Sequence, residues 1–370
     1  MKEFIYSVYA LLFNMASKLF KVKKNRVALV SMHNENFKDS LGSIYEELEK
    51  SGNYEFVLIS RQDLEIKLSN VFRVISFFLV KSRKLATSKY VYLNDNFLPM
   101  SKLNFQKEAV ITQLWHGEGV FKKFGFAIKQ ADEVRKRESQ ANKKLTYVVC
   151  SSKAVVPYYA EAFGCDEKRV LPLGSPRTDY FFKGENAKKA RKRLDALYPS
   201  LCGKKLVLYA PTFRDDLSKN SEILSHFDIS LFNEELSDEY ALLIRLHPQV
   251  HSDVGTLSGA VDVTDFDDVR QLVLSCDVLI TDYSSICMDF SLLSKKTVFY
   301  AYDLQKYTAD RDFYFNYESY VPGKVAATTD EVIAAIKEPF DKEKNEKFKS
   351  FNFDYEDGFS AKRVIEFVQK

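Results

Sequence analysis

The sequence predicts an α/β protein of two Rossmann-like, doubly wound domains, preceded by an amphipathic helix. Short apolar runs typical of buried parallel strands alternate with segments of helical periodicity along most of the 370 residues. The most distinctive polar clusters stand directly after the apolar runs, where open parallel sheets bind their ligands. An apolar content of 46% gives the chain ample material for two cores.

Residues 1–25 are predicted to form a membrane-associating helix. Apolar residues recur at roughly helical spacing between Phe4 and Phe20, and lysines interrupt and follow them. Because the polar residues make this helix amphipathic, lying on a membrane surface is favoured over spanning the membrane. The alternative interpretation is a helix that docks on its own domain.

The first domain is predicted to cover residues 26–183. Its strands are expected at 26–32, 54–60, 90–94, 109–114, 145–150 and 170–173, and its main helices at 40–50, 71–81, 129–143 and around 158–163. Strands that alternate with helices in this way imply a parallel sheet.

The second domain is predicted to cover residues 184–345, beginning with a charged helix at 185–197. Its strands are expected at 205–210, 240–246, 261–263, 278–281 and 297–300. The last segment, 346–370, contains a helix at 359–368 that is expected to pack back on the first domain. Two such domains facing a cleft form the architecture of two-domain, nucleotide-sugar glycosyltransferases, which is called GT-B.

Charge and cysteine content narrow the class of protein. The 54 basic and 51 acidic residues leave a net charge of +3, which does not require a nucleic-acid partner. The five cysteines are widely spaced and match neither a zinc site nor a disulfide framework, so they are expected to be reduced in the cytoplasm. Asp215 and Asp216 lack a separate Asp-x-Asp pair, and we expect no metal and no other cofactor.

Residues 277–300 are predicted to form a strand, a hydroxyl-rich turn, a short helix and a second strand. Ser284 and Ser285 stand where the helix should begin, as cap residues, and the free amides of its first turn are suited to hold a phosphate. Asp282 would repel such a ligand unless it orients a hydroxyl, an arginine or a histidine. A helix-capping carboxylate is the alternative interpretation of Asp282.

Four polar clusters follow predicted strands, at 115–119, 210–216, 245–248 and 281–285. Two of them contain a histidine, His116 and His247. A lone histidine is more often structural than catalytic, but the shared position at strand ends favours a role in chemistry, and imidazole titrates near neutral pH.

Five sequence clusters in one order carry a family resemblance: Trp115-His116-Gly117, Ala-Pro-Thr-Phe-Arg at 210–214, Arg-Leu-His-Pro at 245–248, Thr-Asp-Tyr-Ser-Ser at 281–285 and Phe-Tyr-Ala-Tyr-Asp at 299–303. Together they resemble the CDP-glycerol glycerophosphotransferase family of bacterial teichoic acid synthesis. The resemblance implies transfer of glycerol phosphate or ribitol phosphate from CDP-glycerol or CDP-ribitol to a hydroxyl of an acceptor, with release of CMP. It also implies an acceptor that is an undecaprenyl-diphosphate-linked saccharide or polyol phosphate, and a peripheral place on the cytoplasmic side of the cell membrane.

The resemblance also implies roles for individual residues. His116 is expected to act as the base for the acceptor hydroxyl, and His247 to stabilise the pyrophosphate or protonate the leaving CMP, although the sequence allows these roles to be exchanged. Asp282 is expected to orient His247 or Arg245. The expected donors to phosphate oxygens are Arg214, Arg245, Ser284 and Ser285, with Arg311 either joining them or forming a surface ion pair. The remaining expected substrate contacts are Trp115, Gly117, Thr212, Asp215, Tyr283 and Asp289.

Two positions depart from many members of that family. Glu118-Gly119 follows the Trp-His-Gly cluster where a small hydroxyl residue is common, and Phe213 replaces a frequent Trp. These changes leave the polyol and the acceptor open, because a carboxylate beside the expected base alters the hydrogen bonds available to a substrate. The alternatives are a nucleotide-sugar glycosyltransferase and a noncatalytic, membrane-bound protein that binds nucleotide or polymer.

Overall fold

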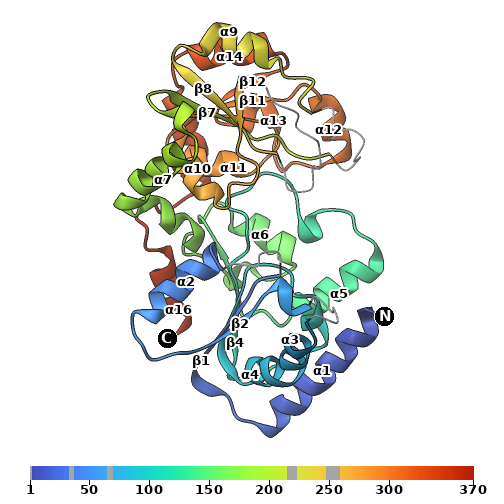
Figure 1. The fold of residues 1–370 in the computed structure, drawn as a ribbon. Coiled ribbons are helices and arrows are strands. Elements are labelled where there is room, and N and C mark those ends of the chain that lie inside the picture. The colour runs from blue at the N-terminus through green and yellow to red at the C-terminus, as the bar shows by residue number, and fades with distance from the viewer. Residues whose placement is uncertain (1, 33–36, 65–69, 215–222, 247–258) are drawn as a thin grey trace. The chain divides into compact units, whose positions relative to one another are not determined.

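In a computed structural model, the chain forms two compact units (Figure 1). The structure describes residues 2–32, 37–64, 70–214, 223–246 and 259–370. Unit 1 consists of Met1–Asp179 and Asp354–Lys370, and unit 2 of Tyr180–Phe353. The chain therefore leaves unit 1, builds unit 2 and returns to unit 1 for its last helix. These crossings, after Asp179 and after Phe353, lie four residues before and eight residues after the boundaries predicted at 183 and 345.

Unit 1 is built on a six-stranded sheet with the order β2-β1-β3-β4-β5-β6, in which all neighbouring strands run parallel. The strands are β1 (Lys23–Val30), β2 (Glu55–Ile59), β3 (Ser88–Leu93), β4 (Val110–Gln113), β5 (Tyr147–Cys150) and β6 (Val170–Pro172). The second half of β1 is buried at every position, because helices cover both faces of a parallel sheet. The strand order reverses at β1, which places β3 on its other side.

The helices of unit 1 largely follow the predicted periodicity. They are α1 (Lys2–Leu19), α2 (Ser40–Glu49), η1 (Arg61–Leu64), α3 (Val71–Ile75), η3 (Ser76–Lys81), α4 (Ser82–Ala86), η4 (Leu98–Lys102), η5 (Gly125–Ala127), α5 (Asp132–Asn142), α6 (Val156–Phe163), η6 (Glu167–Arg169) and α16 (Ser360–Val368). The helix expected at 71–81 is longer than predicted and contains the π-helical turn η3 in its middle.

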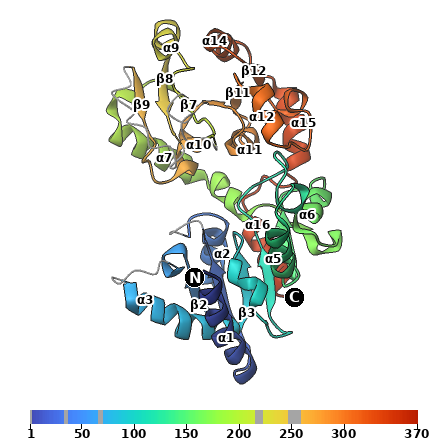
Figure 2. The same ribbon diagram turned by 90° about the vertical axis from the view of Figure 1, so that its right-hand side faces the viewer.

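Unit 2 repeats the architecture with a parallel sheet of the order β12-β11-β10-β7-β8-β9. The strands are β7 (Lys205–Tyr209), β8 (Tyr240–Ile244), β9 (Ala260–Asp262), β10 (Val278–Thr281), β11 (Lys296–Tyr300) and β12 (Lys324–Ala326). The helices are α7 (Gly184–Leu197), η8 (Pro199–Leu201), α9 (Ile229–Leu236), α10 (Val269–Ser275), α11 (Ile286–Leu292), α12 (Leu304–Asp310), α13 (Tyr317–Tyr320), α14 (Thr329–Lys337) and α15 (Lys342–Asn352), and η7 (Pro176–Phe182) leads in from unit 1. Helices α9 and α14 lie side by side in Figures 1 and 2. The predicted α/β class, with a parallel sheet in each half, is confirmed.

Helix α1 is amphipathic in the structure, and its two faces have different environments. Tyr9 and Phe13 are buried on one face, where the Tyr9 ring stacks on Phe77 of η3 at 4.5 Å. On the other face, Leu11 is 61% and Leu19 is 72% exposed. One face of α1 therefore docks on unit 1, as the alternative interpretation expected, while the apolar side chains of the other face stay exposed. In the part of the chain that the structure describes, every helix is too short or too polar to span a bilayer.

Helix α16 is held on unit 1 by a cap from a distant part of the chain. The carboxylate of Asp179 accepts hydrogen bonds from the backbone N–H groups of Ser360, at 2.9 Å, and Ala361, at 2.8 Å. These groups lie in the first turn of α16, so Asp179 satisfies two amides that a helix leaves unpaired. The buried side chain of Val364 then joins the core around β1 and α2.

Candidate active site

The first predicted cluster forms a sharp turn directly after β4. Trp115 has a φ of 57°, a left-handed conformation that is rare for a bulky residue. Two contacts hold it: its backbone N–H donates to Oε1 of Gln113 at 3.0 Å, and its ring stacks on Phe124 at 5.1 Å. The turn presents the next side chain, His116, which is 49% exposed. Backbone strain of this kind is concentrated at functional sites.

The exposed imidazole of His116 is paired with a buried carboxylate. Nδ1 of His116 lies 3.0 Å from Oδ1 of Asp95, whose side chain is 1% exposed. The other oxygen of Asp95 accepts from the backbone N–H of Met32 at 3.3 Å. A carboxylate on Nδ1 selects the tautomer and turns Nε2 away from Asp95, as a general base requires.

Asp95 is a residue that the sequence analysis missed. It directly follows the strand predicted at 90–94, and the turn of His116 follows the strand predicted at 109–114. The structure pairs these two strands, β3 and β4, so their carboxyl ends are neighbours. The available signal was therefore a carboxylate after one strand and a histidine after another, but the sequence alone does not state that the strands are adjacent.

Glu118 does not project from this turn as a simple surface carboxylate. It is buried, and its Oε1 accepts from Arg177 at 3.1 Å and from the hydroxyl of Ser175 at 3.2 Å. The carbonyl of Gly117 accepts from the hydroxyl of Tyr159 at 2.7 Å. The unusual Glu118 is thus part of the support behind the turn, which corrects the expectation that it alters hydrogen bonding to a substrate.

In unit 2, Arg214 is the centre of a buried ion cluster. Nε and Nη2 bind the two oxygens of Asp303 at 2.8 and 3.0 Å, and Nη1 lies 2.9 Å from Oδ2 of Asp282. Burial alone would lower the pKa of Arg214, but Asp282 and Asp303 raise it above its ordinary value, so the guanidinium remains charged. The fork of Arg214 is thus occupied by two carboxylates inside unit 2, and its expected role as a phosphate donor stays a prediction.

Asp282 organises the turn that follows β10. Its Oδ1 accepts from the backbone N–H groups of Thr212, at 2.8 Å, and Tyr283, at 2.6 Å. Asp282 therefore pairs with Arg214 and not with Arg245, which corrects that part of the prediction. The helix-cap alternative is wrong as well, because the residue at the cap of α11 is Ser285.

Tyr283, an expected substrate contact, is fully buried. Its ring stacks on Tyr307 at 3.6 Å, and its hydroxyl donates to Asp303 at 2.9 Å. Asp289, in the first turn of α11, is also buried. Both side chains are thus buried inside unit 2 and do not form its surface.

The two serines after β10 remain at the surface. Ser285 is exposed at the cap position of α11, but its side chain makes no capping hydrogen bond, whereas the hydroxyl of Ser284 accepts from the backbone N–H of Ile286 at 3.4 Å. Thr212 is half-buried, and its backbone N–H donates to Asp282, the residue two positions before Ser284. These hydroxyls lie at the carboxyl ends of β10 and β7, which are paired in the sheet. This edge is where an open parallel sheet binds a ligand.

The other expected site residues are engaged elsewhere or are not described. Nη1 of Arg245 donates to three backbone carbonyls after β9, at Val263, Thr264 and Phe266. Burial lowers the pKa of Arg245, and nearby aspartates oppose this shift. Arg311 is exposed at the end of α12. His247 and Asp215 lie outside the described residues.

Comparison with known proteins identifies the family. The family described as CDP-Glycerol:Poly(glycerophosphate) glycerophosphotransferase matches residues 11–370. The chain belongs to this family. The resemblance found in the five sequence clusters is thereby confirmed, and it extends into the N-terminal half of the chain.

This glycerophosphotransferase family member is similar to two curated proteins of Bacillus spizizenii. It is 33% identical to the teichoic acid poly(ribitol-phosphate) polymerase, a match that covers 98% of this chain and 60% of the polymerase. It is 31% identical to the teichoic acid ribitol-phosphate primase, with 98% of this chain and 96% of the primase covered. The chain thus spans somewhat more than half of the polymerase and nearly all of the primase.

A solved structure supports the same assignment. A variant of the wall teichoic acid polymerase TagF superposes with a TM-score of 0.79 at 25% sequence identity, covering 98% of this chain and 92% of the TagF chain. The two sheets of this family member therefore have the fold of a teichoic acid polymerase.

No metal site is found among the residues that the structure describes. A group of three or more His, Cys, Asp or Glu side chains that could hold a metal ion is absent from residues 2–32, 37–64, 70–214, 223–246 and 259–370.

Proposed function

We propose that this protein transfers a polyol phosphate from a CDP-polyol to a hydroxyl of a lipid-linked acceptor and releases CMP. The observation that carries the proposal is the His116–Asp95 pair on a strained, exposed turn at the carboxyl edge of the first sheet. A hydroxyl is a poor nucleophile near neutral pH, and an imidazole oriented by a carboxylate is suited to accept its proton.

In the proposed step, His116 removes the proton of the acceptor hydroxyl. The acceptor oxygen forms a bond to the phosphorus that carries the polyol, while the bond from that phosphorus to the oxygen of CMP breaks. The electron pair of the broken bond leaves with CMP, and the proton resides on the imidazole. Asp95 stabilises the imidazolium through Nδ1 and keeps its ring in place, so we name it a positioning residue.

The surface hydroxyls of unit 2 are proposed to bind the pyrophosphate of the CDP-polyol. Ser284 and Ser285 offer hydroxyls at the end of β10, and the buried cluster of Arg214, Asp282 and Asp303 fixes the turn that carries them. Preorganised donors of this kind stabilise the charge that develops in phosphoryl transfer. His247 stays the proposed second histidine, as the family resemblance implies.

Ribitol phosphate is the polyol phosphate that we propose first. The two relatives described above carry ribitol phosphate in their names. One of the solved TagF structures was soaked with CDPG, so the glycerol donor must be compared in the same assay. The lipid-linked acceptor is proposed from the teichoic acid role of these relatives.

We also propose a peripheral association with the membrane through the uncovered face of α1. Leu11, Met15 and Leu19 are exposed on α1, and Lys18 beside them is exposed as well. Near α1 in unit 1, the chain from Val71 to Val80 adds further exposed apolar side chains, of which Phe72 is the most exposed. Apolar side chains with flanking lysines bind the interface of anionic bilayers.

The transferase activity is tested with purified protein, CDP-ribitol or CDP-glycerol, and a lipid-linked disaccharide with or without a polyol-phosphate extension. We expect release of CMP and an acceptor mass increased by one or more polyol phosphates. His116→Ala should lower kcat by about 100- to 10,000-fold, the range that general base catalysis contributes. A product with a glycosidic bond, or a His116→Ala variant with normal turnover, would refute the proposal.

The membrane proposal is tested by sedimentation with vesicles that contain anionic lipid. The double variant Leu11→Glu, Leu19→Glu should remain in the supernatant to a greater extent than the wild type. Leu197→Glu is the matched control, because Leu197 is an exposed leucine of unit 2, 56% exposed, outside the proposed surface. Equal partitioning of the double variant and the control would contradict a role of α1.

A further inference from the structure

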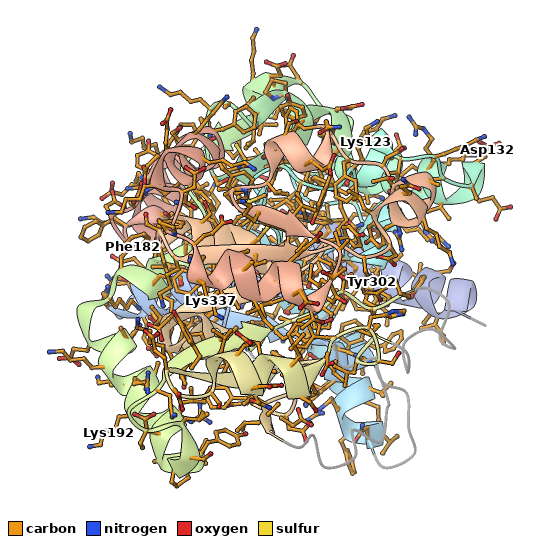
Figure 3. All side chains as sticks on the ribbon, turned by 90° about the horizontal axis from the view of Figure 1, so that it is seen from above. Lys123, Asp132, Phe182, Lys192, Tyr302 and Lys337 are labelled. Atoms are coloured by element: carbon orange, nitrogen blue, oxygen red, sulfur yellow. The ribbon has the colours of Figure 1, made fainter. Side chains whose placement is uncertain are left out.

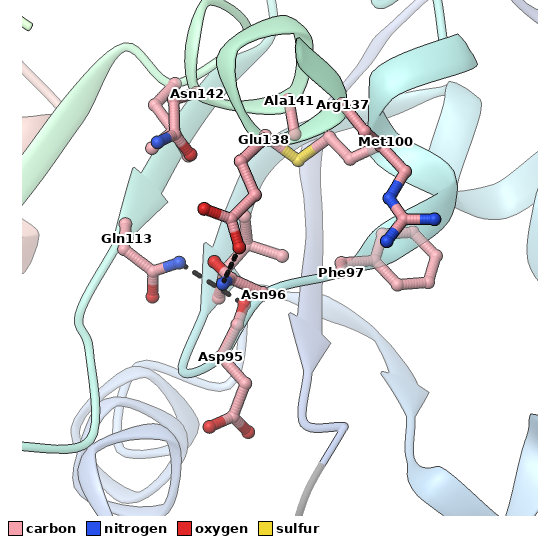
Figure 4. Close-up of a pocket in the computed structure, with 11 residues that line it drawn as sticks. Asp95, Asn96, Phe97, Met100, Gln113, Arg137, Glu138, Ala141 and Asn142 are labelled. Atoms are coloured by element: carbon pink, nitrogen blue, oxygen red, sulfur yellow. Dashed lines mark hydrogen bonds between the residues drawn. The ribbon is translucent and has the colours of Figure 1, made fainter. Parts of the chain in front are cut away.

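A single buried amide joins the two turns that carry His116 and Asp95. Gln113 is the last residue of β4, and its side chain is 2% exposed. Its Oε1 accepts from the backbone N–H of Trp115 at 3.0 Å, and its Nε2 donates to the backbone carbonyl of Asp95 at 3.2 Å. Figure 4 shows the second of these contacts, with the amide of Gln113 directed at the turn after β3.

We infer that Gln113 is a positioning residue that sets the geometry of the His116–Asp95 pair. This inference rests on the proposed role of His116 as the base. Gln113 is paired with Leu93 in the register of β4 and β3, and each turn begins immediately beyond this pair. One side chain thus holds the residue before His116 in its left-handed conformation and at the same time fixes the backbone of Asp95.

The chemistry of the amide explains why glutamine stands here. The two contacts require an acceptor and a donor on the same carbon, and the amide of glutamine supplies both without a charge. A carboxylate at this position would face the carbonyl of Asp95 with an acceptor, and an apolar side chain would remove the hydrogen bonds to the N–H of Trp115 and the carbonyl of Asp95. The loss of either bond removes a constraint on its turn, so the turn would rearrange.

The imidazole is sensitive to such a rearrangement because its contact with Asp95 orients it. His116 is half exposed, and the contact that fixes its tautomer is the 3.0 Å pair with Asp95. A displacement of about 1 Å at a reacting group can lower a rate by about 100-fold. We therefore assign to Gln113 an effect on the chemical step and not on donor binding, since the proposed pyrophosphate site is built from residues of unit 2.

Gln113→Met is the principal variant, because methionine has a similar volume but neither hydrogen-bonding function. The matched control is Asn142→Leu. Asn142 lines the same small cavity of about 20 Å³ beside Gln113, but its amide donates its hydrogen bond to the carbonyl of Phe163, at the end of α6. Both variants lose a side-chain amide at one cavity, and thermal unfolding will show how far each remains folded.

Two measurements separate positioning from a merely structural role. Gln113→Met should lower kcat by ~10- to 100-fold with KM for the CDP-polyol changed by less than ~2-fold, whereas Asn142→Leu should keep the wild-type kcat. In an Asp95→Ala background, Gln113→Met should lower kcat by less than a further ~3-fold, because both residues act through the same imidazole. A fully additive loss, or a wild-type kcat in Gln113→Met, would overturn the inference.

A spectroscopic test does not depend on turnover. In ¹⁵N-histidine spectra, with His116 assigned from the His116→Asn variant, the wild type should show the Nδ1–H tautomer and Gln113→Met a mixture of tautomers. An unchanged tautomer in Gln113→Met contradicts the inference even if the enzyme is active. If no CDP-polyol yields CMP, the proposed function fails, and the tautomer experiment still decides whether Gln113 positions His116.

Discussion

Removing the guanidinium of Arg214 should destabilise unit 2 more than any surface charge deletion in the same unit. Arg214→Met leaves Asp282, 2% exposed, and Asp303 without their shared cation. Breaking a buried ion pair costs about 3–5 kcal/mol. Because the side chain of Asp303 keeps 20% exposure and some hydration, we expect the lower part of that range, about 3–4 kcal/mol.

The loss is measured by urea denaturation followed by far-UV circular dichroism. With a denaturant slope of about 2 kcal/mol per molar, the midpoint should fall by about 1.5–2 M. The fluorescence of Trp115, the one tryptophan of the chain, reports unit 1 separately. We therefore expect a larger shift in the dichroism, to which both units contribute, than in the fluorescence of Trp115.

Two variants test the physical reason for this loss. Lys337→Met is the matched control, since Lys337, labelled in Figure 3, pairs at 2.6 Å with Glu235 while both side chains are about half exposed. Its loss should stay below about 1 kcal/mol. Adding Asp282→Asn and Asp303→Asn to Arg214→Met should restore part of the stability by removing the unpaired charges. A loss below about 1 kcal/mol in Arg214→Met alone would refute the reasoning.

Three further predictions concern the stability contributed by buried or paired side chains, two in unit 1 and one in unit 2. Asp179→Ala should lower the free energy of unfolding by about 2 kcal/mol and expose α16 to limited proteolysis, because two N–H groups at its start lose their acceptor; an uncut α16 would contradict this. The hydrogen bond from Arg26 lowers the pKa of Glu55 to about 2, so its stabilisation is present above pH 4.5 and is lost as the pH falls towards 2. Glu55→Gln should therefore be less stable than the wild type by about 1 kcal/mol near neutral pH and show a smaller difference in acid urea titrations. Lys295→Met should lower the thermal midpoint by several degrees, about 2 kcal/mol, since Nζ donates to three carbonyls at the end of α10, and an unchanged midpoint would show that water replaces it.

The predicted elements show which local signals suffice. The runs at 278–281 and 205–210 became inner strands within a residue of their predicted bounds, because a buried parallel strand needs a continuous apolar stretch. The edge strand β12 was not predicted; its three residues, Lys324–Ala326, include one buried side chain. The helix at 71–81 was found, but its π-helical turn was not, because residues 74–80 are almost all apolar and show no periodicity from which a change of helical period could be recognised.

In the candidate site, the positions of residues at strand ends were predicted, but their long-range partners were not. His116, Ser284 and Ser285 were predicted correctly to lie at strand ends, since that position follows from the alternation of strands and helices. The ion cluster of Arg214 was not predicted, because Asp303, 89 residues away in the chain, occupies its fork. Long-range pairs of this kind depend on strand order and register, which one sequence does not display.

The sequence by itself determined the class of fold, the sheet edges that carry the site and, through its ordered clusters, the family. Only the tertiary structure decided which polar side chains are exposed and which hold one another. Asp95 became the partner of His116, and Gln113 the link between them, because β3 and β4 are neighbours in one sheet. The physical reason is that periodic burial is a local property of the chain, whereas the partner of a buried charge is set by contacts between distant segments.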